Sequence, residues 1–390
     1  MKASKDIIRL FIYSFFSNLY LERNIFVIFL LYKGLSLAQI MIGQMVINIS
    51  MTVSEIPTGL ISDFIGKKKG LLIGSFLVIT YYFFLLFAEN FVLYLLAACC
   101  LGVGSTFVSG TDEAYLYTLL DNNKLNESSL KYLGRLNSII TISSLIAIII
   151  GGLIQKVNWT ILIILCFFSQ LLSLMFLLSI NDTTHNNKFT LTQKPISILN
   201  EYILVLKSNN YMKGFLLFIG FHFGMVSAII LLTQDVLMKF GLQTELIAIF
   251  FFIDNVLSAI LYRIIEKITS IIEKMKLINV CFLMSMVGFC CIMASNVYIV
   301  MTSVIVLNLA SSLAIIVLFD VYSTNLNDSI RATGISFYNM ISALIMAVIF
   351  ATASLFNDIY LSIVCIGGAL ITFGCIIFVI KSKKAIVNGK

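Results

Sequence analysis

Residues 55–69 read Glu-Ile-Pro-Thr-Gly-Leu-Ile-Ser-Asp-Phe-Ile-Gly-Lys-Lys-Lys. This stretch closes one apolar block, residues 37–61, and leads through three lysines into the next, residues 70–88. A helix needs about 20 apolar residues to cross the hydrocarbon core of a bilayer, and both blocks are of that length. Strands of a membrane barrel would instead alternate apolar and polar residues over about ten positions. The quoted stretch is therefore predicted to be a polar loop between two transmembrane helices.

The composition of the chain extends this interpretation to its whole length. Of 390 residues, 60% are hydrophobic and 12% are charged, whereas an ordinary soluble domain has roughly 25% charged residues. A soluble globular protein, a disordered protein and a nucleic-acid-binding protein are thereby excluded. All eight cysteines fall inside apolar blocks, so neither a disulfide framework nor a metal site is expected. No cofactor is expected either.

Twelve apolar blocks follow one another along the chain. They cover residues 7–32, 37–61, 70–88, 91–119, 134–154, 159–180, 211–238, 246–265, 277–294, 297–322, 333–355 and 359–380. The predicted fold class is an all-α membrane protein with twelve transmembrane helices in two pseudo-symmetric six-helix bundles.

The basic residues predict the orientation of these spans. In the twelve-span scheme, 22 of the 26 lysines and arginines lie in loops and termini on one side. Lys33, Lys156 and Lys239 lie on the other side, and Arg23 lies within a span. Because basic loops stay on the cytoplasmic face, both termini are predicted to be cytoplasmic in a multi-pass protein of a bacterial-type cell membrane.

Residues 181–210 are polar and divide the chain into an N-terminal bundle, residues 1–180, and a C-terminal bundle, residues 211–390. Apolar side chains recur here at helical spacing, which predicts an amphipathic helix on the inner membrane surface. They are Ile196, Leu199, Ile203 and Leu206. An irregular linker is the alternative. The two halves also echo each other: Glu113 precedes Asp121 by eight residues, and Asp320 precedes Asp328 by eight.

The spacing of Gly59, Asp63 and Gly66, followed by Lys67 and Lys68, resembles the signature loop of the major facilitator superfamily. The twelve spans, the cytoplasmic termini and the central linker fit this family over the full chain. The resemblance implies a transporter that works by alternating access between its two halves. It also implies that the first, fourth, seventh and tenth helices line a central cavity.

These five residues form the predicted conformational lock motif. Gly59 is expected to let the second span end against a neighbouring helix, and Gly66 to permit a tight turn. Asp63 is expected to dock on the positive N-terminal end of the eleventh span, near Arg331, and so to favour an outward-open state. The alternative is a hydrophilic turn whose charges only orient the chain.

Two departures put the drug–proton antiporter branch of the family in doubt. Cys99 stands where those antiporters usually carry an arginine before a Gly-x-Gly, here Gly102 to Gly104. The fifth span keeps the glycine pair Gly151-Gly152 but has no proline. Neither departure affects the predicted fold.

Ionisable residues at membrane depth are the candidate proton and substrate sites, because each is costly there unless it has a partner or faces a cavity. They are Glu22, Arg23, Asp112, Glu113, Asp254, Asp320 and His222. Glu22 and Arg23 are adjacent and point about 100° apart, so Arg23 needs an acid from another helix, with Asp254 as the candidate. A buried structural ion pair is the alternative for each acid. For His222, a hydrogen bond that only supports packing is favoured over proton relay.

Glu22, Glu113 and Asp254 are the candidates for a proton-carrying carboxyl group. The predicted function is proton-coupled efflux of a small organic or amphipathic compound by a monomer in the lipid bilayer. The alternatives are a proton-coupled uptake permease for a nutrient and a membrane sensor that keeps the fold without transport. An enzyme is not expected, because the spans carry no catalytic cluster and the chain has no phosphate-binding loop.

Overall fold

The computed structural model describes residues 5–123, 125, 129–181, 203–207, 213–214, 216–217, 220–324, 328–355 and 360–388. These residues are almost entirely helical, and they include no strand. The helices are α1 (Lys5–Ser17), η1 (Arg23–Ile25), α2 (Phe26–Tyr32), α3 (Leu37–Ile65), α4 (Lys67–Leu85), α5 (Phe91–Val108), α6 (Thr111–Asn122), α7 (Ser129–Ile154), α8 (Trp159–Leu178), α11 (Gly220–Lys239), α12 (Thr244–Ile271), α13 (Lys274–Cys291), α14 (Val297–Thr324), α15 (Asp328–Leu355) and α16 (Tyr360–Asn388).

The predicted all-α membrane fold is confirmed. Within the described residues, ten helical segments are long and apolar enough to cross a membrane. The first span, which is made of α1 to α2, and α16, with its apolar part Val364–Phe378, bring the number to twelve. Three of these helices start at polar N-cap residues. Ser36 forms a capping box at the start of α3, and Asn90 and Asn158 accept backbone N–H groups at the starts of α5 and α8.

The described residues divide into two compact units. Unit 1 holds the helices up to α8 together with Gln243–Phe252 at the start of α12, and unit 2 holds the remaining described residues. The predicted bundle limits at residues 180 and 210 stay predictions. Of the predicted linker, residue 181 and the helical residues 203–207 are described, and the rest of the proposed amphipathic helix lies outside the described residues.

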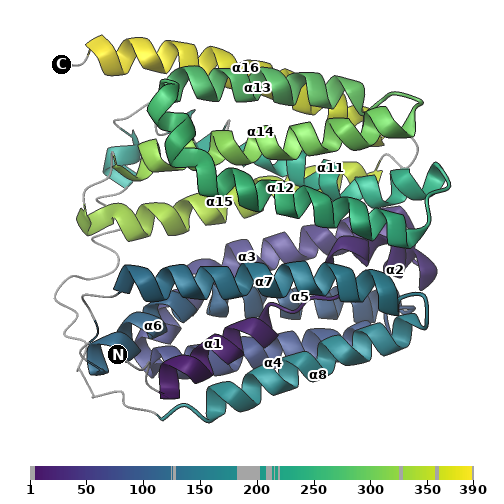
Figure 1. Cartoon of the computed structure of the whole chain (residues 1–390), viewed down its shortest axis with the longest axis vertical. Helices are drawn as coiled ribbons and strands as arrows, with labels where there is room; N and C mark the ends of the chain where they lie inside the picture. The colour runs from purple at the N-terminus through teal and green to yellow at the C-terminus, as the bar shows by residue number, and fades with distance from the viewer. Residues whose placement is uncertain are drawn as a thin grey trace. The chain divides into compact units, whose positions relative to one another are not determined.

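Unit 1 is built around α4, which packs against α3, α5 and α8. The helix α1 lies against α7 and α8, and Figure 1 shows α1, α4 and α8 side by side. At the end of the unit that carries the N-terminus, α1, α6, α7 and α8 share a core of buried apolar side chains that includes Ile7, Leu116 and Leu136. The core also includes Leu71 of α4, so it fixes the ends of five helices.

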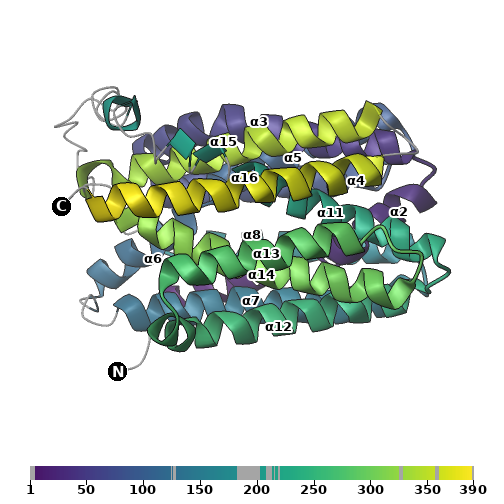
Figure 2. The same cartoon turned by 90° about the horizontal axis from the view of Figure 1, so that it is seen from above.

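Unit 2 repeats these pairings with its own helices. The helix α13 packs against α14 and α16, as α4 packs against α5 and α8, and Figure 2 shows α13, α14 and α16 side by side. The helix α11 packs against α15 and α16, as α1 packs against α7 and α8. The repeated pairings are those of an internally duplicated membrane protein.

The predicted loop at residues 55–69 is wrong in extent. The helix α3 continues through Ile65, and α4 starts at Lys67, so Gly66 alone breaks the helical run. Gly66 has φ +100°, a conformation that side chains with a Cβ rarely adopt, and this confirms its predicted role in a tight turn. Gly59 lies inside α3 and is exposed, and a Cβ there would contact nothing within 4 Å. The role of Gly59 in ending the second span against a neighbouring helix stays a prediction.

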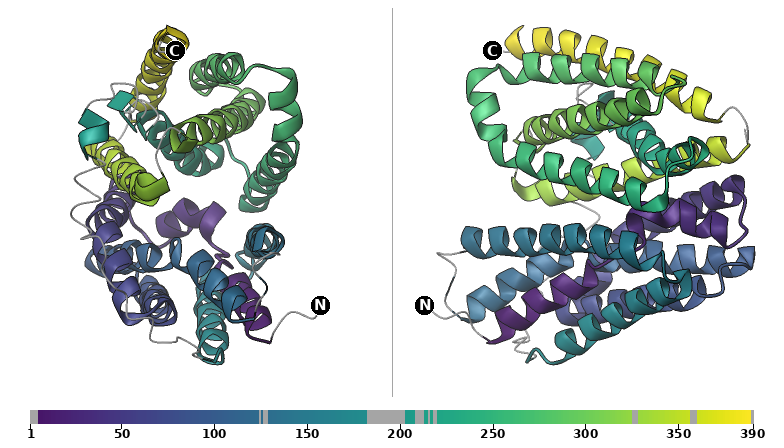
Figure 3. Two further views of the ribbon diagram at one scale, coloured as in Figure 1. Left: turned by 90° about the vertical axis from the view of Figure 1, so that its left-hand side faces the viewer. Right: turned by 45° about the vertical axis from the view of Figure 1, so that its right-hand side comes forward.

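Two predicted continuous spans are interrupted. The first span stops being helical between Ser17 and Arg23, and Figure 3 shows this interruption between two purple helices. The fourth span breaks between α5 and α6, where Gly110 has the left-handed φ of +72°. Both interruptions place backbone polar groups at membrane depth, which a protein tolerates only where neighbouring groups satisfy them.

Candidate functional site

The interruption of the first span is held by side chains from α7 and α8. Ser143 Oγ donates a hydrogen bond to the Phe15 carbonyl at 2.6 Å, and Gln170 Nε2 donates to the Ser17 carbonyl at 3.1 Å. The last carbonyl groups of a helix have no partner within that helix. These two bonds satisfy such carbonyls and so make the end of α1 stable inside the membrane.

Gly151 of α7 lies directly against the same interruption. A Cβ atom on this residue would be 1.9 Å from the Leu21 carbonyl oxygen and 2.9 Å from the Leu21 carbonyl carbon. Only glycine allows the backbone of α7 to approach so closely. In the glycine pair Gly151-Gly152, the first glycine is therefore required by the close approach of Leu21.

Glu22 is the acid that this interruption positions, and its residue is 3% exposed. Tyr82 Oη of α4 lies 2.9 Å from Glu22 Oε1 and 3.1 Å from Oε2, and Cys166 Sγ of α8 donates to Oε2 at 3.3 Å. Both donors are neutral. Within the described residues no ion pair joins Glu22 to a cation. A carboxyl group surrounded in this way suits binding and release of a proton.

Arg23 differs from Glu22 in burial, although Glu22 lies in the non-helical interruption and Arg23 starts η1. Glu22 is buried whereas Arg23 is exposed. No ion pair of the described residues involves Arg23. Its pairing with Asp254 stays a prediction.

The interruption of the fourth span explains how two adjacent acids stand at membrane depth. Asp112 and Glu113 occupy the first turn of α6, directly after Gly110. The positive end of a helix dipole favours negative charge at that place. The Asp112 side chain also accepts the Glu113 N–H at 2.8 Å. Asp112 is half-buried and Glu113 is exposed.

Asp254 is the buried acid of unit 2 and is 2% exposed. Its Oδ2 accepts a hydrogen bond of 2.6 Å from Asn308 Nδ2, which connects α12 to α14. Asp254 Oδ1 has no hydrogen-bond partner among the described residues. The other acid predicted in this half of the chain is Asp320, on the tenth span. Asp320 lies in α14, and its side chain is outside the described part of the structure.

His222 is fully buried in unit 2 and has a partner at each ring nitrogen. Nδ1 lies 3.0 Å from Thr372 Oγ1, and Nε2 lies 3.0 Å from Ser311 Oγ. Thr372 donates its own proton to the Gly368 carbonyl, so its oxygen is left to accept from Nδ1–H. Ser311 then donates to Nε2. This pattern is satisfied by neutral imidazole, which supports the interpretation of His222 as a packing residue.

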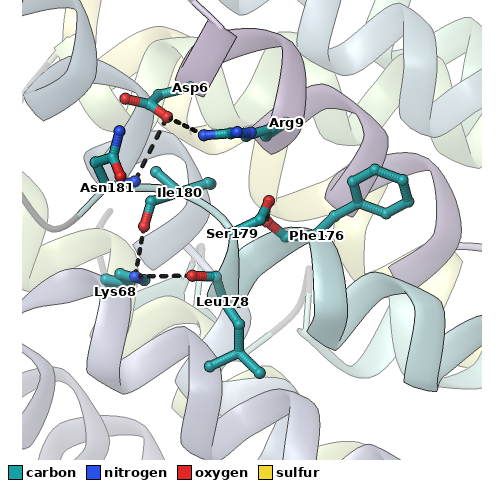
Figure 4. A network of polar contacts seen from close by, with 8 residues as sticks. All are labelled: Asp6, Arg9, Lys68, Phe176, Leu178, Ser179, Ile180 and Asn181. Atoms are coloured by element: carbon teal, nitrogen blue, oxygen red, sulfur yellow. Dashed lines mark hydrogen bonds and ion pairs between the residues drawn. The ribbon is translucent and has the colours of Figure 1, made fainter.

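The predicted lock motif is tied into unit 1 by two lysines with different partners. Lys67 forms an ion pair with Asp63 one turn earlier in the chain. Lys68 is buried and donates to the Ile180 carbonyl at 2.6 Å and to the Leu178 carbonyl at 3.4 Å. Figure 4 shows Lys68 at these carbonyls, beside the contacts of Asp6.

Asp6 completes this network at the end of α8. Its Oδ1 accepts from Arg9 at 2.9 Å and from the backbone N–H of Asn181 at 3.4 Å, as Figure 4 shows. A lysine at the last carbonyls of a helix also interacts favourably with the negative end of the helix dipole. Lys68 and Asp6 therefore anchor the C-terminal end of α8 to α4 and α1.

Partners of these sites that were not identified from the sequence include Tyr82, Cys166, Gln170 and Asn308. Gln170 and Asn308 carried a usable signal, because an amide inside an apolar block needs a hydrogen-bond partner. Tyr82 is one of 16 tyrosines and Cys166 one of eight cysteines, so residue type alone could not single out either of them.

Comparison with known proteins agrees with this architecture. The sequence profile of the Major Facilitator Superfamily matches residues 10–351. An uncharacterized MFS-type transporter of Methanocaldococcus jannaschii is 24% identical over 274 residues. That match covers 69% of this chain and 66% of the relative, just under two thirds of its length.

Solved structures are similar over nearly the whole chain. A mutant form of the nucleoside transporter NupG has a TM-score of 0.82 at 12% identity, with 96% of this chain and all of that chain covered. A D-xylose-proton symporter has a TM-score of 0.73 at 12% identity, with 94% and 95% covered. At such identities the similarity is one of fold.

Proposed function

Because the chain belongs to the Major Facilitator Superfamily, we propose that it is a secondary active transporter that works by alternating access. In this proposal the movement of a small organic compound is coupled to protons, and Glu22 carries the proton. The chain acts in a cell membrane with both termini in the cytoplasm. The lock motif Gly59 to Lys68 controls exchange between the two halves.

The surroundings of Glu22 support the choice of this acid. A carboxylate without a cationic partner is disfavoured in a low-dielectric interior, whereas Tyr82 and Cys166 donate hydrogen bonds that stabilise it. These opposing effects allow both protonation states. The interruption of the first span adds a backbone that can adjust as the state changes. Glu113 and Asp254 remain the other candidates for the proton carrier.

Two directions of transport follow from different observations. The aromatic-rich spans, with 32 phenylalanines and 16 tyrosines, favour efflux of an amphipathic compound, which is the direction that we propose. The similarity in fold to a D-xylose-proton symporter favours uptake as the second candidate. The experiment must therefore measure both directions.

Proteoliposomes with an imposed pH gradient test the proposal. Nucleosides, pentoses and amphipathic cationic dyes are offered on either side, and a pH-sensitive dye reports proton movement. We expect one class to move against its gradient, and an uncoupler to stop it. Glu22→Gln should abolish proton movement. Glu89→Gln is the matched control, because the Glu89 side chain is 72% exposed and pairs with Lys33.

Normal proton-driven transport by Glu22→Gln would refute the assignment of Glu22. The same outcome in Glu113→Gln and Asp254→Asn as well would refute proton coupling through this set of acids. Absence of any flux, with the protein correctly inserted, would favour the sensor alternative.

A further inference from the structure

We propose that Asp254 and Ser258, with Asn308 as the residue that positions Asp254, form a binding site for one sodium ion in unit 2. The inference goes beyond proton coupling through Glu22, since sodium binding is measurable without transport. It rests on two buried oxygen atoms that lack partners, on their spacing, and on the charge balance around them.

Asp254 and Ser258 are four residues apart on α12, so their side chains lie on one face of the helix, one turn apart. Asp254 is about 15 Å from the start of α12 at 1.5 Å per residue, which is half the thickness of a bilayer core. Asn308 of α14 lies on the same side, because its Nδ2 donates to Asp254 Oδ2 at 2.6 Å. Three oxygen-bearing side chains thus meet near the middle of the membrane.

Two oxygens in this group have no partner among the described residues. Asp254 Oδ1 and Ser258 Oγ are both buried and unbonded, in residues that are 2% and 8% exposed. Most buried hydroxyl groups on helices of unit 2 behave differently. Thr233 and Ser285, for example, donate to the carbonyl one turn earlier, at 2.7 and 2.9 Å. Ser258 keeps its oxygen free of its own helix, one helical turn from Asp254, whose Oδ1 is the only carboxylate oxygen in this unbonded set.

The charge balance selects the kind of ion. No ion pair of the described residues involves Asp254, so the carboxylate would leave one negative charge in a low-dielectric region. One monovalent cation neutralises this charge, whereas a divalent cation would leave an excess positive charge. Carboxylate and hydroxyl oxygens are hard ligands that suit hard cations. The described residues hold no group of three histidine, cysteine or acidic side chains that would suit a transition metal.

A proton alone would use this site differently. Protonation of Asp254 neutralises the charge but does not require Ser258. A sodium ion draws ligands from both oxygens, while Asn308 holds the carboxylate in place through Oδ2. The Ser258 hydroxyl therefore distinguishes the two ions, and its removal is the decisive change.

The test measures thermal unfolding of the full chain in nanodiscs as NaCl replaces choline chloride at constant ionic strength and pH. We expect a saturable rise of the unfolding temperature with sodium, and no such rise with potassium. Binding of ²²Na⁺ to the same samples gives a direct measurement. Ser258→Ala should weaken sodium binding by about tenfold or more, and Asp254→Asn should abolish it.

Two variants serve as controls. Ser303→Ala removes a buried hydroxyl on α14 whose one bond among the described residues is to the Ile299 carbonyl, so it should respond to sodium as the wild type does. Glu22→Gln should also keep the response, because Glu22 lies in unit 1.

The inference is overturned if sodium changes neither unfolding nor ²²Na⁺ binding in the wild type. It is also overturned if Ser258→Ala binds sodium normally. A response to pH that is lost in Asp254→Asn, without any response to sodium, would make this a proton site and reject the sodium assignment. None of these outcomes depends on whether Glu22 couples transport to protons.

Discussion

Substitution of Gly151 by alanine should destabilise unit 1 through the interruption of the first span. The added Cβ would lie 1.9 Å from the Leu21 carbonyl oxygen, against about 3.4 Å for an ordinary contact, so something must move by about 1.5 Å. The obstacle is backbone rather than the flexible end of a side chain. Overpacking of this kind costs about 1–3 kcal/mol. The higher helix propensity of alanine returns up to about 1 kcal/mol.

Because the obstacle is backbone, the upper end of the overpacking range applies, and the net cost is about 2 kcal/mol. This corresponds to a fall of roughly 4–8 °C in unfolding temperature for a unit of this size. Thermal unfolding in nanodiscs, followed with a thiol-reactive dye, measures it. Gly134→Ala is the matched control on the same helix α7, because a Cβ there meets nothing within 4 Å. Gly134→Ala should unfold at or above the wild-type temperature.

Transport gives a second measurement of the same change. Leu21 precedes Glu22, so a displaced Leu21 carbonyl should also move the Glu22 carboxyl group away from Tyr82. Gly151→Ala protein that remains folded should therefore lose proton movement more than Gly134→Ala does. Equal unfolding temperatures for Gly151→Ala and Gly134→Ala would show that the close approach of α7 to the interruption is not a constraint.

Three further predictions concern the other polar contacts. His222→Leu should lower stability by about 1–3 kcal/mol through lost buried hydrogen bonds and leave transport intact; lost transport with unchanged unfolding would instead indicate proton relay. Lys68→Met should lower the unfolding temperature by removing the cap of α8, whereas Lys69→Met should not, since Lys69 is exposed. Asp63→Asn should slow transport if the lock motif acts as proposed. Expression and stability should stay normal, because the Asp63 side chain is 38% exposed and bonds only to Lys67 among the described residues. Transport at the wild-type rate would reject the lock.

Patterns that extend over a whole helix could be predicted from the sequence. A run of about 20 apolar residues is costly to leave in water, so the number of spans followed directly from composition. The turn at Gly66 followed from residue type, since glycine adopts positive φ at little cost. Each of these inferences uses information contained in one segment.

Contacts between segments could not be predicted in the same way. The interruption at residues 18–22 lies in a block that is apolar on both sides, and the groups that satisfy its backbone, Ser143 and Gln170, are more than 120 residues away. Lys68 belongs to a basic run that is expected to face water, yet it is buried because the carbonyls of Leu178 and Ile180, at and just after the end of α8, lie beside it. Membrane helices tolerate such breaks and charges when neighbours compensate them, and single-sequence patterns do not reveal the neighbours.

The two interruptions also limit what the internal duplication implies. The fourth span is broken in unit 1, whereas its counterpart in unit 2, α14, is continuous from Val297 to Thr324. The first span is also broken, and of its counterpart, the seventh span, the structure describes α11 from Gly220 to Lys239 as one helix. The helix pairings are shared, so the packing does not require the breaks. Their causes are local: Gly110 adopts a left-handed conformation, whereas Val317, its counterpart by the eight-residue echo, lies inside the continuous helix α14. Gly151 makes room for Leu21. The duplicated halves therefore carry different polar sites, a hydrogen-bonded Glu22 at a helix break and an Asp254 between intact helices, and the substitutions proposed for them should act independently.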